Sequence, residues 1–145
     1  MLSRENVARL ARLIVACNDD ARAHAAAALV VGGSRGDRLN AAAARRLSFA
    51  DELAEQVRSS GGRPEEGGSA FEGIRAALHG LNALVIGENA GDAYGSCARI
   101  EAKTERLYER AAGPDMPISV SEVIGRHYLE IAADRAELRR LSMGG

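Results

Sequence analysis

Residues 97–111 read CARIEAKTERLYERA, and they place an acidic residue on the apolar face of a helix. The side chains that share this face recur at steps of three and four and are Tyr94, Cys97, Glu101, Thr104, Tyr108 and Ala111. Glu101 therefore lies where a core residue is expected. An ionised carboxylate is costly to remove from water without a partner, so we expect a cation, hydrogen-bond donors, a metal ion or a proton to meet it.

The spacing of apolar residues along the rest of the chain predicts four long helices in a single domain. Their ranges are residues 4–31, 37–59, 90–112 and 118–142. Ser3 is expected to cap the first helix, and Ser119 and Glu122 are spaced as a capping box for the fourth. Residues 32–36, GGSRG, leave room only for a turn, so the first two helices are expected to run antiparallel.

The connection between the second and third helices, residues 60–89, is too long for a hairpin turn. Glycine and proline dominate its first part, whereas residues 70–86 regain apolar spacing and are expected to form a short helix. A connection of this length reaches back along the bundle, so the helices that it joins are expected to run parallel. One long crossover is typical of ferritin-like bundles. The sequence therefore predicts an all-α fold, a ferritin-like four-helix bundle.

The composition narrows the possible functions. With 145 residues and 46% hydrophobic side chains, the chain is long enough to bury a core of its own. Its formal net charge of −1 provides no field to hold nucleic acid or an anionic membrane. The longest apolar run, residues 25–31, is too short to span a bilayer, and the N-terminal residues do not resemble a signal peptide. We therefore expect a cytoplasmic protein with no nucleic-acid or membrane partner.

Several polar or reactive side chains lie on the predicted apolar seams. Cys17 and Cys97 are expected to be free thiols that pack as small hydrophobic residues. His24 has no carboxylate within a turn on its own stripe and is interpreted as a satisfied core residue. Arg46 interrupts the seam of the second helix, and it is expected either to extend its head group to solvent or to form a pair, with Glu52 as the candidate partner.

The polar seam residues of the last two helices are expected to meet. Antiparallel folding about a turn near Asp115 places Glu101 level with residues around 129, so the nearest seam position is His127. One interpretation is a buried hydrogen-bonded pair of Glu101 and His127, with a hydroxyl donated by Tyr94 or Tyr108. A buried acid and imidazole of this kind titrate together and can respond to pH.

The other interpretation is a metal site in the same layer. The candidate ligands are the acids and the histidine expected near the middle of the bundle, namely Glu52, Glu101, His127 and Glu130. Asp20 is expected to be a further neighbour. Glu and His together can hold a single divalent ion such as zinc. A di-iron site needs a Glu from each of two helices and Glu-x-x-His from each of the other two, and no Glu-x-x-His occurs in this chain.

A set of short motifs carries a resemblance that covers most of the chain, residues 6–141. They occur in the order Phe49-x-x-Glu52-Leu53, Gly61-Gly62-x-Pro64, Gly68-Ser69 and Cys97-x-x-x-Glu101, followed by Tyr108. In this order and spacing the sequence resembles a group of small bacterial proteins with a ferritin-like four-helix bundle, carried as a domain of unknown function. The resemblance implies a ferritin-like fold and descent from carboxylate-bridged di-metal proteins, and it implies no established reaction.

Two functions are expected from these observations. The first is a structural or interaction module that is not an enzyme, needs no cofactor and forms a homodimer through its alanine-rich helix faces. The alternative is a metal-binding ferritin-like protein that holds iron or zinc with Glu52, Glu101 and His127 and carries out oxidase-type chemistry.

Overall fold

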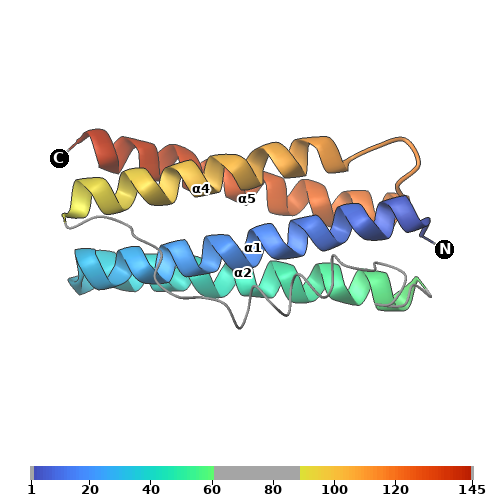
Figure 1. Cartoon of the computed structure of the whole chain (residues 1–145), viewed down its shortest axis with the longest axis horizontal. Helices are drawn as coiled ribbons and strands as arrows, with labels where there is room; N and C mark the ends of the chain where they lie inside the picture. Colours follow the sequence, from blue (N-terminus) through green and yellow to red (C-terminus); the bar gives the residue numbers. More distant parts are fainter. Residues whose placement is uncertain (1, 61–88, 145) are drawn as a thin grey trace.

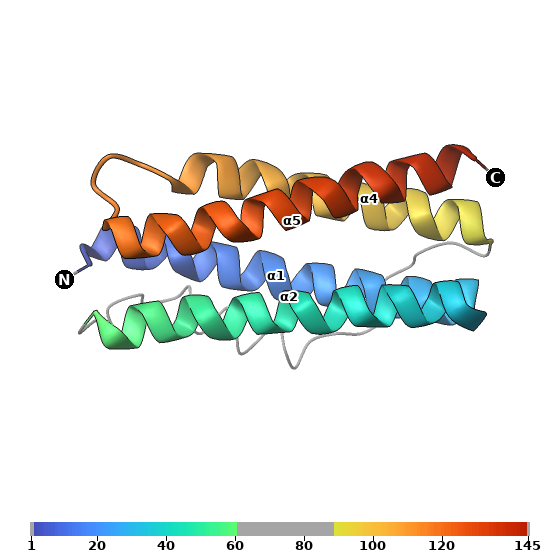
Figure 2. The same ribbon diagram turned by 180° about the vertical axis from the view of Figure 1, so that it is seen from behind.

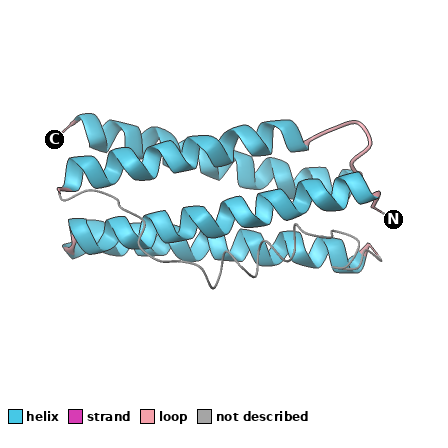
Figure 3. Ribbon diagram, in the orientation of Figure 1, coloured by secondary structure: helices cyan, strands magenta, loops and turns pink. Residues whose placement is uncertain are grey.

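The computed structural model describes residues 2–60 and 89–144, which form four long helices that lie side by side (Figure 1). The helices are α1 (Arg4–Val31), α2 (Gly33–Ser59), α4 (Ala90–Ala111) and α5 (Ile118–Met143). The view from behind shows the same arrangement (Figure 2), and these residues contain no strand (Figure 3). The all-α bundle expected from the sequence is therefore confirmed. None of the described helices has the length and apolar character needed to cross a membrane.

The turn between α1 and α2 is shorter than expected. Helix α1 begins after Ser3, whose hydroxyl accepts a hydrogen bond from the backbone N–H of Asn6 at 3.1 Å. It ends at Val31, with Gly32 as its C-cap, and α2 starts at Gly33 because Gly32 and Gly33 both adopt positive φ angles and reverse the chain by themselves. At Gly36 a side chain would lie 2.9 Å from the carbonyl oxygen of Ala28, so glycine there allows close contact between the two helices.

The hairpin of α4 and α5 is closed by the loop at residues 112–117. Asn89 caps α4 by accepting a hydrogen bond from the N–H of Asp92 at 2.8 Å. Helix α5 starts at Ile118, directly after Pro117, whose carbonyl oxygen accepts the first backbone hydrogen bonds. The capping box expected at Ser119 is therefore wrong, because the helix begins one residue before it and has no side-chain cap.

The direction of the helices gives the connectivity of the bundle. The two hairpins are antiparallel within themselves, and α2 and α4 run in the same direction, from the left end to the right end in Figure 1. This parallel pair agrees with the expectation drawn from the long connection. The short helix expected at residues 70–86 lies outside the described residues.

The core has two apolar parts. At the end of the bundle that holds the N-terminus of α1, large side chains such as Leu10, Leu53 and Ile124 pack together. At the other end the buried residues are mostly smaller, including Ala23, Ala27 and Ala93. Helix α1 packs on α2 and α4, and α4 packs on α5, whereas α2 and α5 make few contacts. Polar side chains occupy the region between the two parts.

Candidate functional site

Charged side chains from all four helices meet at the centre of the bundle. We call this group the charged layer, and its members are Asp20, Arg46, Glu101 and Asp134. The Arg46 guanidinium is the hub, because its Nε and Nη2 both donate hydrogen bonds to Oε1 of Glu101, the first at 3.1 Å. Its Nη2 also lies 2.5 Å from Oδ2 of Asp134. Its Nε lies 3.7 Å from Oδ2 of Asp20.

The charges of this layer are compensated inside the protein. Arg46, Glu101 and Asp20 have no exposed side-chain surface. Burial raises the pKa of Asp20 well above its ordinary value, and the neighbouring Glu101 adds to the effect, so both disfavour the charged form of Asp20. Burial opposes the charge on Arg46, but Glu101 and Asp134 outweigh it and raise the pKa of Arg46.

The outer edge of the charged layer reaches the surface through Asp134. Its side chain is partly exposed, and Nη2 of Arg45 lies 3.5 Å from its Oδ2 on the solvent side. One buried arginine and one surface arginine therefore lie against the carboxyl groups of the layer.

His24 lies beside the charged layer on α1. Its Nδ1 is 2.7 Å from the carbonyl oxygen of Asp20, and because a carbonyl only accepts, Nδ1 carries the proton. Burial lowers the pKa of His24, so the ring is neutral and Nε2 is an acceptor. Nε2 has no hydrogen-bond partner among the described residues and lies 3.9 Å from Oε2 of Glu101. His24 is therefore a core residue that is satisfied at only one of its two ring nitrogens, which differs from the expectation of a fully satisfied side chain.

A second polar group lies beside the charged layer, toward the N-terminal end of α1. We call it the neutral layer, and its members are Cys17, Tyr108 and His127. The Tyr108 hydroxyl lies 3.2 Å from Sγ of Cys17 and 2.9 Å from Nδ1 of His127. The His127 ring stacks on Phe49, with 3.9 Å between ring centroids. These contacts connect α1, α4, α5 and α2 through uncharged groups.

Burial keeps the neutral layer uncharged. It lowers the pKa of His127 to about 4, against the opposing effect of Glu52, and raises the pKa of Cys17 to about 12. Burial, with Cys17 nearby, also raises the pKa of Tyr108 well above its usual range. Cys97, near the charged layer, is likewise a free buried thiol whose pKa is raised by burial. Both cysteines are free, as expected, and neither is activated as a nucleophile.

One end of the neutral layer leads to the surface. Nε2 of His127 lies 3.5 Å from Oε2 of Glu52 but makes no hydrogen bond with the described residues. Glu52 is partly exposed and accepts a hydrogen bond from Nη2 of Arg126 at 2.6 Å, which lowers the pKa of Glu52. Glu52 is therefore the partner of Arg126. Of the alternatives considered for Arg46, a buried pair is observed, but the partners are Glu101 and Asp134 and not Glu52.

The expected contact between Glu101 and His127 is also wrong. Glu101 contacts Arg46, which also contacts Asp134 of α5, whereas His127 contacts Tyr108. The reason is the register of the α4–α5 hairpin. The contacts that Arg46 makes with both Glu101 and Asp134, and that Tyr108 makes with His127, place these residues level about a point between Pro117 and Ile118 and not about Asp115. This shift moves the residue opposite Glu101 by more than one helical turn along α5.

The candidate metal ligands are therefore divided between different places. Glu101 belongs to the charged layer, Glu52 and His127 are neighbours at the edge of the neutral layer, and Glu130 is exposed on α5. Within residues 2–60 and 89–144, no group of three or more His, Cys, Asp and Glu side chains is placed to hold a metal ion.

Sequence reasoning missed the central position of Arg46. A signal was present, because Arg46 is the cation that interrupts a predicted seam, whereas Glu101 and Asp134 are acids that interrupt two others. Matching seam residues by charge across helices would have suggested this group.

Comparison of the chain with family models, curated proteins and solved structures gives no match. The resemblance to small ferritin-like bacterial proteins therefore stays a prediction.

Proposed function

We propose that this protein is a ferritin-like four-helix bundle of the cytoplasm that acts as a structural or interaction module and not as an enzyme. The observation that supports the proposal is the position of Arg46. In carboxylate-bridged bundles, acids from several helices project inward onto metal ions. Here Glu101 and Asp134 project inward onto a guanidinium, which supplies the positive charge that a metal would otherwise supply.

The side chains near Arg46 are also poorly suited to proton transfer or nucleophilic attack. A general acid or base works best when its pKa lies near the working pH and when it can reach the substrate. Asp20 and His24 are buried, and burial shifts each of them toward its neutral form. The buried thiols of Cys17 and Cys97 have raised pKa values. These features favour a structural role for the bundle centre.

Elemental analysis tests this proposal. The protein is expressed in medium supplemented with iron and zinc, purified without chelators and compared with the Glu101→Ala variant. We expect no stoichiometric metal in the wild-type protein. The proposal would be overturned if the wild-type protein and Glu52→Gln contained a stoichiometric metal and Glu101→Ala did not. That result would place an ion at the bundle centre.

A second candidate function is the binding of one divalent ion, zinc or iron, at Glu52 and His127. It is favoured by the position of Nε2 of His127, which lies 3.5 Å from Oε2 of the partly exposed Glu52. An imidazole nitrogen beside a carboxylate is a donor pair that zinc accepts. Glu130, on the same helix as Arg126, is a further candidate ligand; after Glu52, it contributes to the raised pKa of Arg126.

Zinc titration followed by calorimetry separates this candidate from the first proposal. Binding to the wild-type protein that is lost in Glu52→Gln supports the site. The matched control is Glu55→Gln, which removes an exposed acid on the same helix that pairs with Arg58. Equal zinc affinity in all three proteins would exclude Glu52 as a ligand.

We further propose that the protein forms a homodimer through the groove between α1 and α4. This groove has a volume of about 350 Å³, and its apolar lining includes Val15, Ile100 and Leu107. Lys103 and Asp19 also line it, so a second copy related by a two-fold axis could place opposite charges together. Light scattering over a concentration series tests the dimer, and Lys103→Glu is expected to weaken it more than Arg106→Glu. A monomeric mass at every concentration would refute it.

A further inference from the structure

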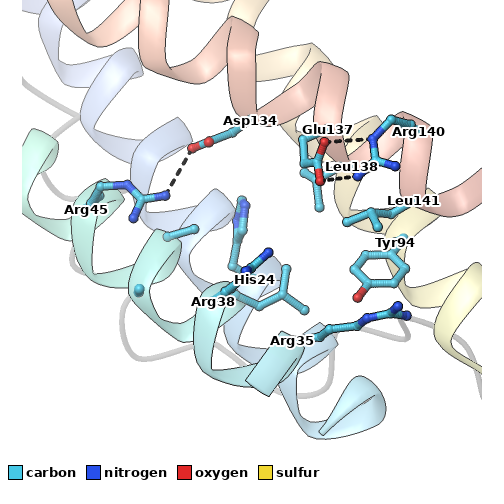
Figure 4. Close-up of a pocket in the computed structure, with 13 residues that line it drawn as sticks. His24, Arg35, Arg38, Arg45, Tyr94, Asp134, Glu137, Leu138, Arg140 and Leu141 are labelled. Carbon is cyan, nitrogen blue, oxygen red and sulfur yellow. Dashed lines mark hydrogen bonds and ion pairs between the residues drawn. The ribbon is translucent and has the colours of Figure 1, made fainter. Parts of the chain in front are cut away.

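A cleft opens between α2 and α5, where these two helices make few contacts (Figure 4). Its volume is about 440 Å³, within the range of small-molecule binding sites. Part of its lining is apolar and comes from Leu39, Leu138 and Leu141. His24 of α1 and Tyr94 of α4 also line it, so the cleft is framed by all four helices.

The cleft carries an excess of arginine. Its charged lining residues are Arg35, Arg38, Arg45, Asp134, Glu137 and Arg140. Two of the arginines are paired, since Arg45 lies 3.5 Å from Asp134 and Arg140 lies 2.5 Å from Glu137. Arg35 and Arg38, in the first turns of α2, are exposed, and neither lies within ion-pair distance of a carboxylate among the described residues. Arg38 acts on Glu137 only from a longer distance, as one cause of the lowered pKa of Glu137, which is paired with Arg140. The two guanidinium groups therefore keep hydrogen-bond donors for an anion.

Two buried polar atoms that lack partners belong to the same cleft. Tyr94 is 3% exposed, and its hydroxyl makes no hydrogen bond with the described residues. Figure 4 shows this hydroxyl on the side of the ring that faces Arg35. His24 is 1% exposed, and its Nε2 is the unpartnered acceptor of the candidate site. Buried polar atoms are nearly always hydrogen-bonded, so these two atoms indicate a site built for a molecule with polar groups.

We propose that this cleft binds a small amphipathic organic anion. Arg35 and Arg38 hold its oxyanion group, a carboxylate or a phosphate, because the guanidinium fork matches either group. Its apolar body lies against Leu39, Leu138 and Leu141. The Tyr94 hydroxyl donates to an oxygen of the ligand, and a hydroxyl of the ligand can donate to Nε2 of His24. This binding site adjoins the charged layer through His24 and Asp134, does not include Glu52 or His127, and does not depend on the proposed function.

Isothermal titration calorimetry with four probes tests the class of ligand: hexanoate, hexyl phosphate, hexanol and inorganic phosphate. We expect saturable binding of hexanoate, hexyl phosphate or both at one site per chain, and at least tenfold weaker binding of the other two probes. The preference between hexanoate and hexyl phosphate identifies the oxyanion. Failure of both amphipathic anions to bind would overturn the proposal, as would equal binding of hexanol or of inorganic phosphate.

Variants locate the site. The double variant Arg35→Gln/Arg38→Gln is expected to weaken binding of the preferred anion at least tenfold, and both positions are exposed, so folding is not at risk. Tyr94→Phe is expected to weaken it about threefold to tenfold by removing one hydrogen bond. The charge-matched control is Arg58→Gln/Arg106→Gln, away from the cleft lining. Equal affinity in the control and in the Arg35/Arg38 variant would show that the anion binds elsewhere.

Discussion

The two polar layers of this bundle bury polar side chains in different ways. In the charged layer, Arg46 is fully buried and is balanced by carboxylates from neighbouring helices. In the neutral layer, Tyr108 and His127 are also buried, but burial suppresses ionisation of both groups. Charge compensation depends on every partner being present, whereas suppression of charge depends on pH. The two layers should therefore be disrupted by different changes.

Phe49 separates the two layers. One face of its ring stacks on His127, and the guanidinium of Arg46 lies 5.1 Å from the ring centroid. The positive charge of Arg46 contributes to the low pKa of His127, although burial is the largest cause. The arginine thus favours the neutral form of the neighbouring layer while it neutralises the acids of its own layer.

The largest expected effect is that of Arg46→Met. The variant leaves Glu101 buried without its cation, so we expect a loss of about 3 to 5 kcal/mol in the free energy of unfolding, measured with urea. The matched control is Arg45→Met, one residue away, where the side chain is 46% exposed and pairs with Asp134. The control is expected to cost less than about 1 kcal/mol. Equal losses in the two variants would show that Arg46 is not the hub of the charged layer.

The next effect is acid sensitivity of the neutral layer. His127 has a pKa of about 4 in the folded protein and an ordinary value of 6.5, so its neutral form stabilises the fold above pH 6.5 and this contribution is lost as the pH falls toward 4. Between these pH values, the free energy of unfolding of the wild-type protein should fall by about 2 to 3 kcal/mol more than that of His127→Gln. Parallel pH profiles for the two proteins would assign the acid sensitivity to other groups.

A smaller effect is expected from loss of the hydroxyl in the middle of the neutral layer. Tyr108→Phe leaves Cys17 and His127 without this hydrogen-bond partner and should cost about 1 to 2 kcal/mol. Tyr128→Phe is the control, because its exposed hydroxyl donates only to Glu109 and should contribute less than about 0.5 kcal/mol. Thermal unfolding of both variants measures the difference. If Tyr108→Phe is as stable as the control, the hydroxyl does not hold the layer together.

The smallest effect concerns the surface end of the neutral layer. Glu52 opposes the lowering of the pKa of His127, so Glu52→Gln should shift this pKa further down. The change in stability should stay below about 1 kcal/mol because Glu52 and Arg126 form a largely exposed pair. Titration of the His127 ring by NMR measures the shift. An upward shift would mean that Glu52 does not act on the ring.

Much of the fold follows from local sequence signals. Ser3 and Gly32 mark the ends of α1, and the apolar seams give the four helices to within a few residues. The start of α2 was placed too late because positive φ angles at Gly32 and Gly33 complete the turn without the three residues that follow. Such boundaries depend on backbone conformation, which the residue types constrain only in part.

The candidate site was predicted only in part. Burial of Glu101 follows from its seam position, and the structure confirms it. Its partners do not follow, because the register of α4 against α5 depends on how the connecting loop is built, and Asp134 lies seven residues, or about two helical turns, beyond His127 on α5. The cleft between α2 and α5 could not be predicted either, since it results from the spacing of two helices that are far apart in the sequence.

A double-mutant cycle on Arg46 and Glu101 tests most directly whether the Arg46 guanidinium stabilises the buried Glu101 carboxyl group. Urea unfolding is measured for Arg46→Met, Glu101→Gln and the double variant. We predict that the double variant loses at least about 2 kcal/mol less than the sum of the two single losses, because neither charge is then left alone. Losses that add to within about 0.5 kcal/mol would contradict the account.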